Sequence, residues 1–394
     1  MNVSIPKIEI LFHKILVFNL LIFIVNQAQI PAPTPFDLGR SQDIAARPMA
    51  LGGSYTAVAS DASALYYNAA GLSAVKKHEI AATLERTALF GFDRADGYPT
   101  HSPQLVDMRI QSLSYLLPIP TSRGGLTFAF GYSRPRTFSD VLRYQDSLAT
   151  TRGNYDYEAV GTQNQYRAGM GLDISPDITF GMALGYLGGQ ESIRVQDSGL
   201  VGYLRTYHGL NLEPSLMVKF TPRMRLGLSL VLWEKIMSLQ EVYEIKGQRD
   251  RQTNYKAENP FQLKIGWSYQ GDDFLLAADC RVYSWSQYQY GLEGAPVLEK
   301  AGYNDEVLLS LGAEKLIAPL NMLVRGGYTF NTLPETNFSS TYDLSRFSTG
   351  VGFLASGSLS IDLAYSYAFW GTAGDGLIMD NHEHRALMTF AYRY

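Results

Sequence analysis

The sequence predicts an all-β membrane protein, a 14-stranded antiparallel transmembrane β-barrel with an N-terminal hatch inside it. Apolar and polar residues alternate almost without interruption from Lys76 to the C-terminal Tyr394. Short turns and long loops alternate between these runs. After residue 28 there is no apolar run of about 18 residues, the length of a transmembrane helix. Only helices and closed barrels satisfy every backbone polar group in lipid, so such a membrane chain must be a barrel.

Composition narrows the class of protein. The chain has 394 residues, of which 46% are hydrophobic and 18% charged, and its net charge is -4. No basic stripe is visible, so we expect no nucleic-acid partner. The counts of Tyr (26), Phe (19) and Gly (36) suit a membrane barrel better than a soluble enzyme. Cys280 is the only cysteine, which excludes a disulfide framework and a cysteine-ligated metal site.

Residues 1–28 are expected to be a secretory signal peptide. Lys7 and Lys14 precede an apolar run of residues 15–25, and Ala28 offers a small residue for cleavage. A transmembrane anchor is the alternative, but this apolar run is shorter than the roughly 20 residues that span a bilayer.

Residues 29–75 are expected to form the hatch inside the barrel. From Arg47 to the end of the motif at Leu72 the chain is built of small residues and aromatics, with Arg47 and Asp61 as its only charges. It is too apolar for a solvated loop, and its glycines make it a poor long helix. We expect Asp61 to cap a turn and Asn68 to hold the next turn, which looks like a helix end at which Gly71 is able to adopt a positive φ.

Residues 76–394 are expected to form the barrel wall. Leu226, Leu228 and Leu230 illustrate the pattern, because they alternate with polar or small residues. Each run has about the length of a tilted spanning strand, roughly 9–11 residues. The predicted strands lie near 77–89, 107–117, 125–134, 163–173, 177–189, 204–219, 223–236, 255–270, 273–286, 305–316, 321–331, 345–355, 358–370 and 383–394.

The connections between these strands indicate their orientation. Short turns such as 175–177 and 356–357 alternate with long loops such as 135–162 and 287–304. Bacterial outer-membrane barrels show this pattern, with the short turns on the periplasmic side. We therefore expect a multi-pass barrel in the bacterial outer membrane, with its lipid bilayer as the surroundings.

The last predicted strand carries a further signal. Phe390, Tyr392 and Tyr394 share one parity, and the chain ends on an aromatic residue. A terminal aromatic on an alternating strand resembles the signal read by the outer-membrane assembly machinery. We expect that machinery to be a partner of the nascent chain.

Charged residues of both signs occupy the inward parity, among them Arg167, Glu213, Lys264, Asp279 and Arg281. One interpretation is a salt-bridged lining that holds the strands and the hatch together. The other is a path for an ion or a charged solute. Buried charges that have partners are mostly structural, which favours the first interpretation.

The sequence predicts no enzyme, no cofactor and no metal. His382 and His384 could hold a metal from alternate strand positions, but two exposed imidazoles are the simpler interpretation. No serine and histidine fall together on one strand face, as a phospholipase would need. We therefore expect no catalytic residues.

The hatch motif resembles that of the FadL/TodX family of outer-membrane transporters for hydrophobic compounds. The resemblance covers about residues 36–72 and is architectural over the strands. Ala69 stands where the family pattern has proline. The residues that the resemblance implies for the shape of the hatch are Arg47, Gly52, Gly53, Asp61, Asn68 and Gly71.

The resemblance also implies how a hydrophobic small molecule would pass. It would bind in an apolar pocket above the hatch and leave sideways through a gap at a kink in one strand. Gly131 and Pro135 in the third strand are the candidates for the gap, because both weaken a strand ladder. The alternative for Gly131 is relief of crowding against the hatch. The expected pocket residues are Phe36, Leu51, Tyr55, Leu65 and Tyr66.

Two functions remain open. The first is uptake of long-chain fatty acids or similar hydrophobic compounds with lateral release. The second is a barrel without transport activity that acts as a scaffold for secreted or envelope proteins, as PorV-like relatives do. A lipid bound in the lumen would favour the first, and a sealed lumen with a protein partner at the loops would favour the second.

Overall fold

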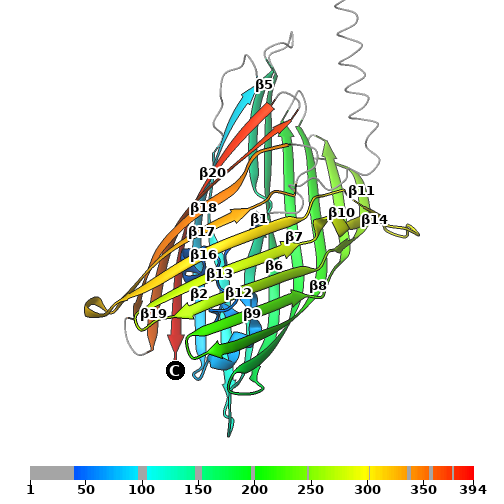
Figure 1. Cartoon of the computed structure of the whole chain (residues 1–394). Helices are drawn as coiled ribbons and strands as arrows, with labels where there is room; N and C mark the ends of the chain where they lie inside the picture. The colour runs from blue at the N-terminus through cyan, green and yellow to red at the C-terminus, as the bar shows by residue number, and fades with distance from the viewer. Residues whose placement is uncertain are drawn as a thin grey trace, which may run out of the picture.

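A computed structural model describes residues 40–95, 104–146, 153–196, 200–245, 248–300, 302–334, 339–354, 358–374 and 377–394. The expected signal peptide (1–28) and Phe36 lie outside these residues. In the described part, one antiparallel sheet closes on itself, because β2 (Glu79–Ala95) pairs with both β3 (Gln104–Ile119) and the last strand, β20 (Leu377–Arg393). The result is the predicted 14-stranded barrel (Figure 1).

The rest of the wall follows in chain order. Its strands are β4 (Leu126–Thr137), β6 (Gly153–Asp173), β7 (Ile178–Gln196), β8 (Leu200–Thr221), β9 (Met224–Val231), β10 (Trp233–Ile245), β11 (Gln248–Asn259), β12 (Gln262–Gln270), β13 (Phe274–Tyr283), β16 (Glu306–Ile317), β17 (Met322–Asn331), β18 (Ser339–Leu354) and β19 (Leu359–Gly374). Smaller elements are β1 (Arg40–Ser41), β5 (Asp140–Asp146), β14 (Gln289–Leu292), β15 (Glu299–Lys300) and the 3-10 turns η2 (Trp285–Gln287) and η3 (Ala318–Leu320). No helix among the described residues is long and apolar enough to cross a membrane.

Two predicted strands are each divided in two. The run 223–236 becomes β9 and β10, and the run 255–270 becomes β11 and β12. Pro260 lies in the second interruption and has no N–H to donate to a ladder, so pairing stops and resumes beyond it. The predicted loops 135–162 and 287–304 also contain paired strands, β5 with β6 and β14 with β15.

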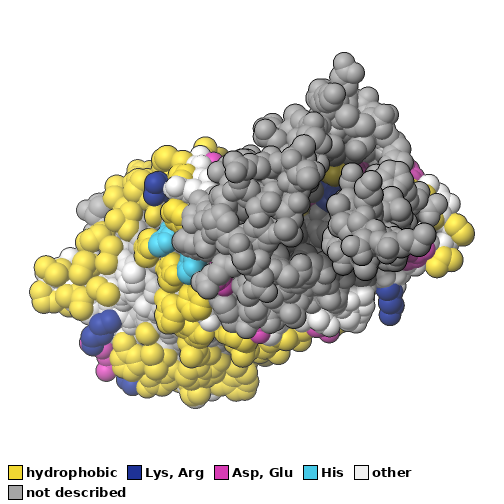
Figure 2. Space-filling model, turned by 90° about the horizontal axis from the view of Figure 1, so that it is seen from above, with side chains coloured by type: hydrophobic (Ala, Val, Ile, Leu, Met, Phe, Trp, Pro, Cys, Tyr) yellow, Lys and Arg dark blue, Asp and Glu magenta, His cyan; other side chains and the backbone are white. Residues whose placement is uncertain are grey.

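The predicted parity of the wall is confirmed. Leu226 and Leu228 are 37% and 41% exposed on the outer face, whereas Ser229, the next residue after Leu228, is fully buried. Hydrophobic side chains cover much of the outer wall in Figure 2. A belt of this kind suits lipid and would be a liability in water.

The parity of β3 changes along its length. Thr83 of β2 pairs with Ser112, but its neighbour Leu84 pairs with Ile110, so Gln111 is an extra residue in the ladder. A bulge of one residue shifts every later side chain to the other face. Met108 and Ile110 therefore point outward above the bulge, and Leu113 does so below it.

The two ends of the barrel segment meet at the short-turn end. The Tyr394 N–H donates to the carbonyl oxygen of His78 (3.1 Å), and the two rings stack at 5.3 Å. Phe390, Tyr392 and Tyr394 all have exposed side chains on the last strand. The C-terminus lies at the lower end in Figure 1.

Candidate functional site

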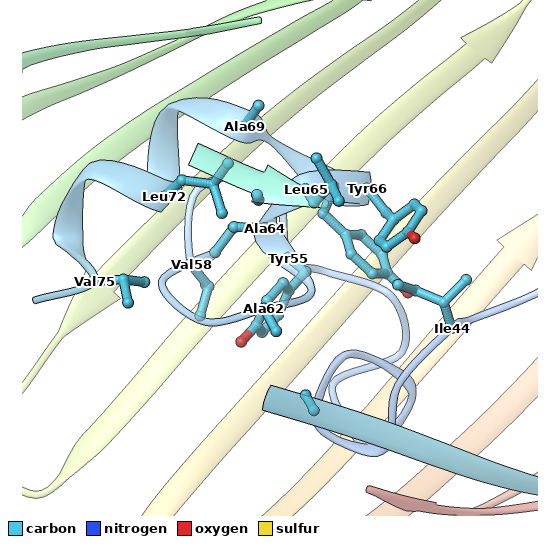
Figure 3. Close-up of a cluster of buried hydrophobic side chains, with 14 of the residues drawn as sticks. Ile44, Tyr55, Val58, Ala62, Ala64, Leu65, Tyr66, Ala69, Leu72 and Val75 are labelled. Atoms are coloured by element: carbon cyan, nitrogen blue, oxygen red, sulfur yellow. The ribbon is translucent and has the colours of Figure 1, made fainter. Parts of the chain in front are cut away.

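The hatch lies within the barrel and is built of three short helical turns. They are α3 (Ala46–Ala50), α4 (Ala64–Tyr67) and η1 (Ala69–Ala74). Their apolar side chains form one buried cluster with inward residues of the wall (Figure 3). Where the wall meets the hatch, it carries glycines: a Cβ at Gly171 would lie 2.6 Å from the carbonyl oxygen of Ala69. The close contact therefore depends on the missing side chain.

One anchor of the hatch is a bidentate ion pair. Arg47 donates from Nε and Nη2 to the two carboxylate oxygens of Glu314, at 3.1 Å each. Glu314 also accepts from Arg325 Nε at 2.6 Å. The Nη1 of Arg47 donates to the Tyr55 hydroxyl, which itself donates to Asp61. These contacts link α3 to the wall and to the rest of the hatch.

A second anchor is a carboxylate on β13. Asp279 Oδ2 accepts from the backbone N–H of Tyr55 (3.0 Å), the N–H of Thr56 (2.9 Å) and the Thr56 hydroxyl (2.6 Å). Hydrogen bonds to a charged group are stronger than neutral ones. Arg281, two residues later on the same face, donates to the carbonyl oxygen of Gly53.

A third anchor is centred on Glu213 of β8. Its carboxylate accepts from Arg167 Nη2 and from Lys264 Nζ, both at 2.6 Å, and from the Ser229 hydroxyl. The same two cations donate to hatch carbonyls, Arg167 to Leu65 (3.1 Å) and Lys264 to Tyr66 (3.2 Å). The inward charges therefore form a salt-bridged lining that holds the hatch.

Turns within the hatch are fixed by local hydrogen bonds. Asp61 Oδ1 accepts from the Ser63 N–H at 3.0 Å. Asn68 Oδ1 accepts from the Ala70 N–H (3.1 Å), and its amide donates to the carbonyl oxygens of Thr56 (2.8 Å) and Leu216 (3.1 Å). Asn68 thus ties η1 to a neighbouring turn and to the wall.

The glycines of the hatch serve two purposes. Gly52 and Gly53 adopt φ of 64° and 80°, which other residues rarely do. Gly71 does not use the positive φ that a glycine allows: it lies inside η1 and is not among the described glycines with positive φ. The carbonyl group of Ala59 packs where its Cβ would be, so close approach explains this glycine.

A cavity of about 80 Å³ lies above the hatch. It is bounded by the start of the described chain, by β4 and by inward side chains of the wall. Its lining includes Gln42, Tyr66, Arg136, Gln165 and Asn211. Burial raises the pKa of the Tyr66 hydroxyl, which therefore stays protonated.

The wall is interrupted beside this cavity. The pairing of β3 with β4 ends at Ser112 and Ser133, and the register of β4 against β6 shifts between Ser133 and Arg136. Beyond this point β4 pairs on the inside with β1 instead, and the Gln42 N–H donates to the carbonyl oxygen of Pro135 (2.8 Å). The bend in β4 thus separates it from β3.

A second cavity, of about 480 Å³, lies on the outer side of the same bend. Residues of β3, β4, β6 and β7 line it, among them Arg109, Arg134 and Thr162. Arg134 faces this outer cavity, while Pro135 and Arg136 line the inner one. Gln111, the bulge residue, bridges the space by donating to the carbonyl oxygens of Asp43 (3.1 Å) and Arg134 (2.8 Å).

Solved structures share this architecture. No protein-family model matches the chain, and no curated protein matches it by sequence. A FadL homologue of Pseudomonas aeruginosa has a TM-score of 0.68 at 14% identity, over 90% of this chain and 99% of that one. This chain has the FadL-type barrel fold.

Two further structures with the FadL-type fold are described as toluene transporters. TodX of P. putida has a TM-score of 0.68 at 13% identity, over 90% of this chain and 99% of that one. TbuX of Ralstonia pickettii has a TM-score of 0.64 at 13% identity, over 89% of this chain and 98% of that one.

In this FadL-type barrel, the residues expected to line the pocket lie in different places. Tyr66 lines the inner cavity. Leu51, Tyr55 and Leu65 are at most 1% exposed and pack between hatch and wall. Phe36 lies outside the described residues.

Of the two residues expected at a gap in the wall, one lies in a regular part of the strand and the other at the bend. Gly131 pairs regularly with Ser114, and a Cβ there would lie 2.5 Å from the Tyr66 hydroxyl oxygen, so this glycine makes room for the hatch. Pro135 lies at the bend itself. Sequence reasoning missed Gln42, Gln111 and Arg134, because only the register of β3 and β4 brings them together.

The two histidines weighed as metal ligands each bind a tyrosine. The Nδ1 atom of His382 is hydrogen-bonded to the Tyr367 hydroxyl, and that of His384 to the Tyr365 hydroxyl, at 2.6 Å each. Among the described residues of this FadL-type barrel, no group of three or more His, Cys, Asp or Glu side chains could hold a metal ion.

Proposed function

We propose that this chain is a bacterial outer-membrane channel through which hydrophobic compounds, long-chain fatty acids among them, enter and are released sideways through the wall. The observation that carries this proposal is the pair of cavities on the two faces of the β4 bend. The hatch is fastened to the wall by buried ion pairs, which favour a route past the hatch over one through it. A lateral route also keeps an apolar solute out of water, where each exposed methylene costs about 0.8 kcal/mol.

The relatives in structure support the same cargo class, since two of them are described as toluene transporters. The bend is the exit for this chain, because the pairing of β3 with β4 ends there and the side chain of Gln111 spans the space with two hydrogen bonds. Small movements of these residues would join the two cavities. Opening would then leave the main ladders of the barrel intact.

Filling the outer cavity tests the proposal. Thr162→Trp with Ser192→Trp places two large rings in the space that these residues line. Leu226→Trp is the matched control, because Leu226 faces outward in a regular part of β9. We expect uptake of a fluorescent fatty acid by whole cells to fall severalfold in the double variant and to stay unchanged in the control. Equal uptake by the double variant and the wild type would exclude this exit.

A scaffold for secreted or envelope proteins is the second candidate. The small inner cavity and the three anchors of the hatch favour it, because they describe a lumen that is closed at rest. Uptake by wild-type cells no greater than by cells without the barrel would leave the scaffold as the remaining function.

A further inference from the structure

The cavity above the hatch is lined by side-chain amides. Gln42, Gln163, Gln165, Asn211 and Gln262 all face it, and each is at most 8% exposed. They come from five separate places in the fold: the segment after β1, two positions on β6, and one each on β8 and β12. An apolar pocket for an alkyl chain would not need this lining.

The amide of Gln42 is the most informative of these groups. It is 8% exposed, and neither its Oε1 nor its Nε2 has a hydrogen-bond partner in the described part of the chain. Asn211 Oδ1 is buried and likewise unpartnered there. A buried polar atom without a partner costs about 1–3 kcal/mol. The cavity therefore offers both a donor and acceptors that an occupant could satisfy.

The charged groups that line the cavity all have partners within the protein. The guanidinium of Arg136 lies over the rings of Tyr283 (5.2 Å) and Trp285 (4.7 Å). Arg167 and Lys264 contact Glu213 at 2.6 Å each. Arg281 lies 3.8 Å from Asp279 and donates to the carbonyl oxygen of Gly53. Glu234 accepts from Asn211 (3.3 Å) and Asn259 (2.6 Å).

An ionised carboxylate accepts hydrogen bonds only and is best held by cations whose charge is not already balanced. Amides both donate and accept hydrogen bonds, as hydroxyl groups do. The cavity of about 80 Å³ has room for a head group but not for a long chain. Next to it, Tyr283 stacks on Trp285 at 6.1 Å, within a cluster of buried aromatics. Tyr283 itself lines the cavity, so its ring can contact the rest of an amphiphile.

We propose that this cavity binds the uncharged head group of an amphiphile, one that carries hydroxyl or amide groups, in preference to a carboxylate. The inference rests on the proposed function and narrows its cargo. Gln42 is its specificity-determining residue. The head group would form hydrogen bonds with the amide oxygen and nitrogen of Gln42, which have no partner within the described residues.

The test uses the full-length barrel in lipid nanodiscs and three ligands of equal chain length: 1-decanoylglycerol, decanoate and decane. We expect decanoylglycerol to bind about tenfold more tightly than decanoate, the change that one or two hydrogen bonds give. Gln42→Met keeps the size of the side chain and removes its hydrogen bonds, so it should abolish that preference. Gln104→Leu, at an exposed position on β3, is the control and should leave it unchanged.

Heat-modifiable migration of each variant shows that the barrel is folded. Equal or tighter binding of decanoate, no binding of decanoylglycerol, or an unchanged preference in Gln42→Met would overturn the inference. Whole-cell uptake of the fluorescent fatty acid separates the two proposals. If wild-type uptake exceeds that of cells without the barrel but the binding results contradict the head-group preference, only the head-group inference is wrong. If wild-type uptake does not exceed that of cells without the barrel, the transport function itself is wrong.

Discussion

Single polar residues decide how the hatch is held in place. Glu213 binds two cations, and each cation also binds a hatch carbonyl, so one carboxylate fixes α4 from two strands. Asp279 does the same for the turn at Tyr55 and Thr56. These groups are buried, and removing one partner of a buried pair costs about 3–5 kcal/mol. Their partners explain why charges line a barrel whose lumen is nearly full.

Asn68 is the residue whose loss should loosen the hatch without harming the barrel. Asn68→Ala removes one accepted and two donated hydrogen bonds, worth about 1 kcal/mol each. We expect the variant to remain heat-modifiable and membrane-inserted but to change its uptake of the fluorescent fatty acid. Asn321→Ala, in a turn at the short-turn end, is a control outside the hatch. Unchanged uptake in Asn68→Ala would show that the hatch does not control passage.

At the scale of elements, the register of each strand is fixed by burial. In β9 the leucines face lipid, while Gly227 and Ser229 face the hatch. A slip by one residue would reverse every side chain, and a buried serine bound to Glu213 would be lost. The bulge at Gln111 is the described place where β3 changes parity, and it lies beside the bend in β4.

Cysteine labelling checks this register. Single cysteines at Leu226 and Leu228 should resist a water-soluble maleimide in intact membranes, because lipid covers them. A cysteine at Thr221, the exposed last residue of β8, should react within the same period. Cysteine at Ser229 should also be protected, since the hatch seals that position. Rapid labelling at both leucines would contradict the register, and native Cys280 is replaced by serine in all variants.

At the scale of the whole molecule, the barrel and the hatch have different sources of stability. The wall closes through backbone ladders, including the seam between β2 and β20, and β4 stays paired with β6 where it leaves β3. The hatch depends on side-chain anchors and on one apolar cluster. Ladders in a closed barrel satisfy every backbone group in lipid, so the wall does not need the hatch to persist.

Removing part of the hatch tests this division. Deleting residues 36–51 removes α3 and the ion pair from Arg47 to Glu314. We expect the deletion variant to insert and to remain heat-modifiable, because no wall strand is cut, but to admit a small hydrophilic dye that the wild type excludes. Arg47→Ala, which removes only the ion pair, should show a smaller leak. Loss of the folded band in the deletion variant would show that hatch and wall fold as one unit.

The sequence by itself determined the closed barrel, the parity of its strands, its lining of paired charges and the compact segment from Arg47 to Leu72. Alternation is a local property, because neighbouring side chains in a strand point to opposite faces whatever the partner strand is. The turn at Asn68 was also readable, since its partner Ala70 is two residues away.

Pro135 marked the place of the bend in the sequence, but only the tertiary structure decided how the wall bends there and what lines the cavity beside it. The bend depends on the pairing of β4 with β1 and on Gln111, and the cavity collects Gln42, Gln165 and Asn211 from three separate strands or segments. No local pattern marks these residues, because each looks like any polar residue on an inward face. Their role arises from the stagger of strands around the barrel, which brings residues far apart in the chain to the same height.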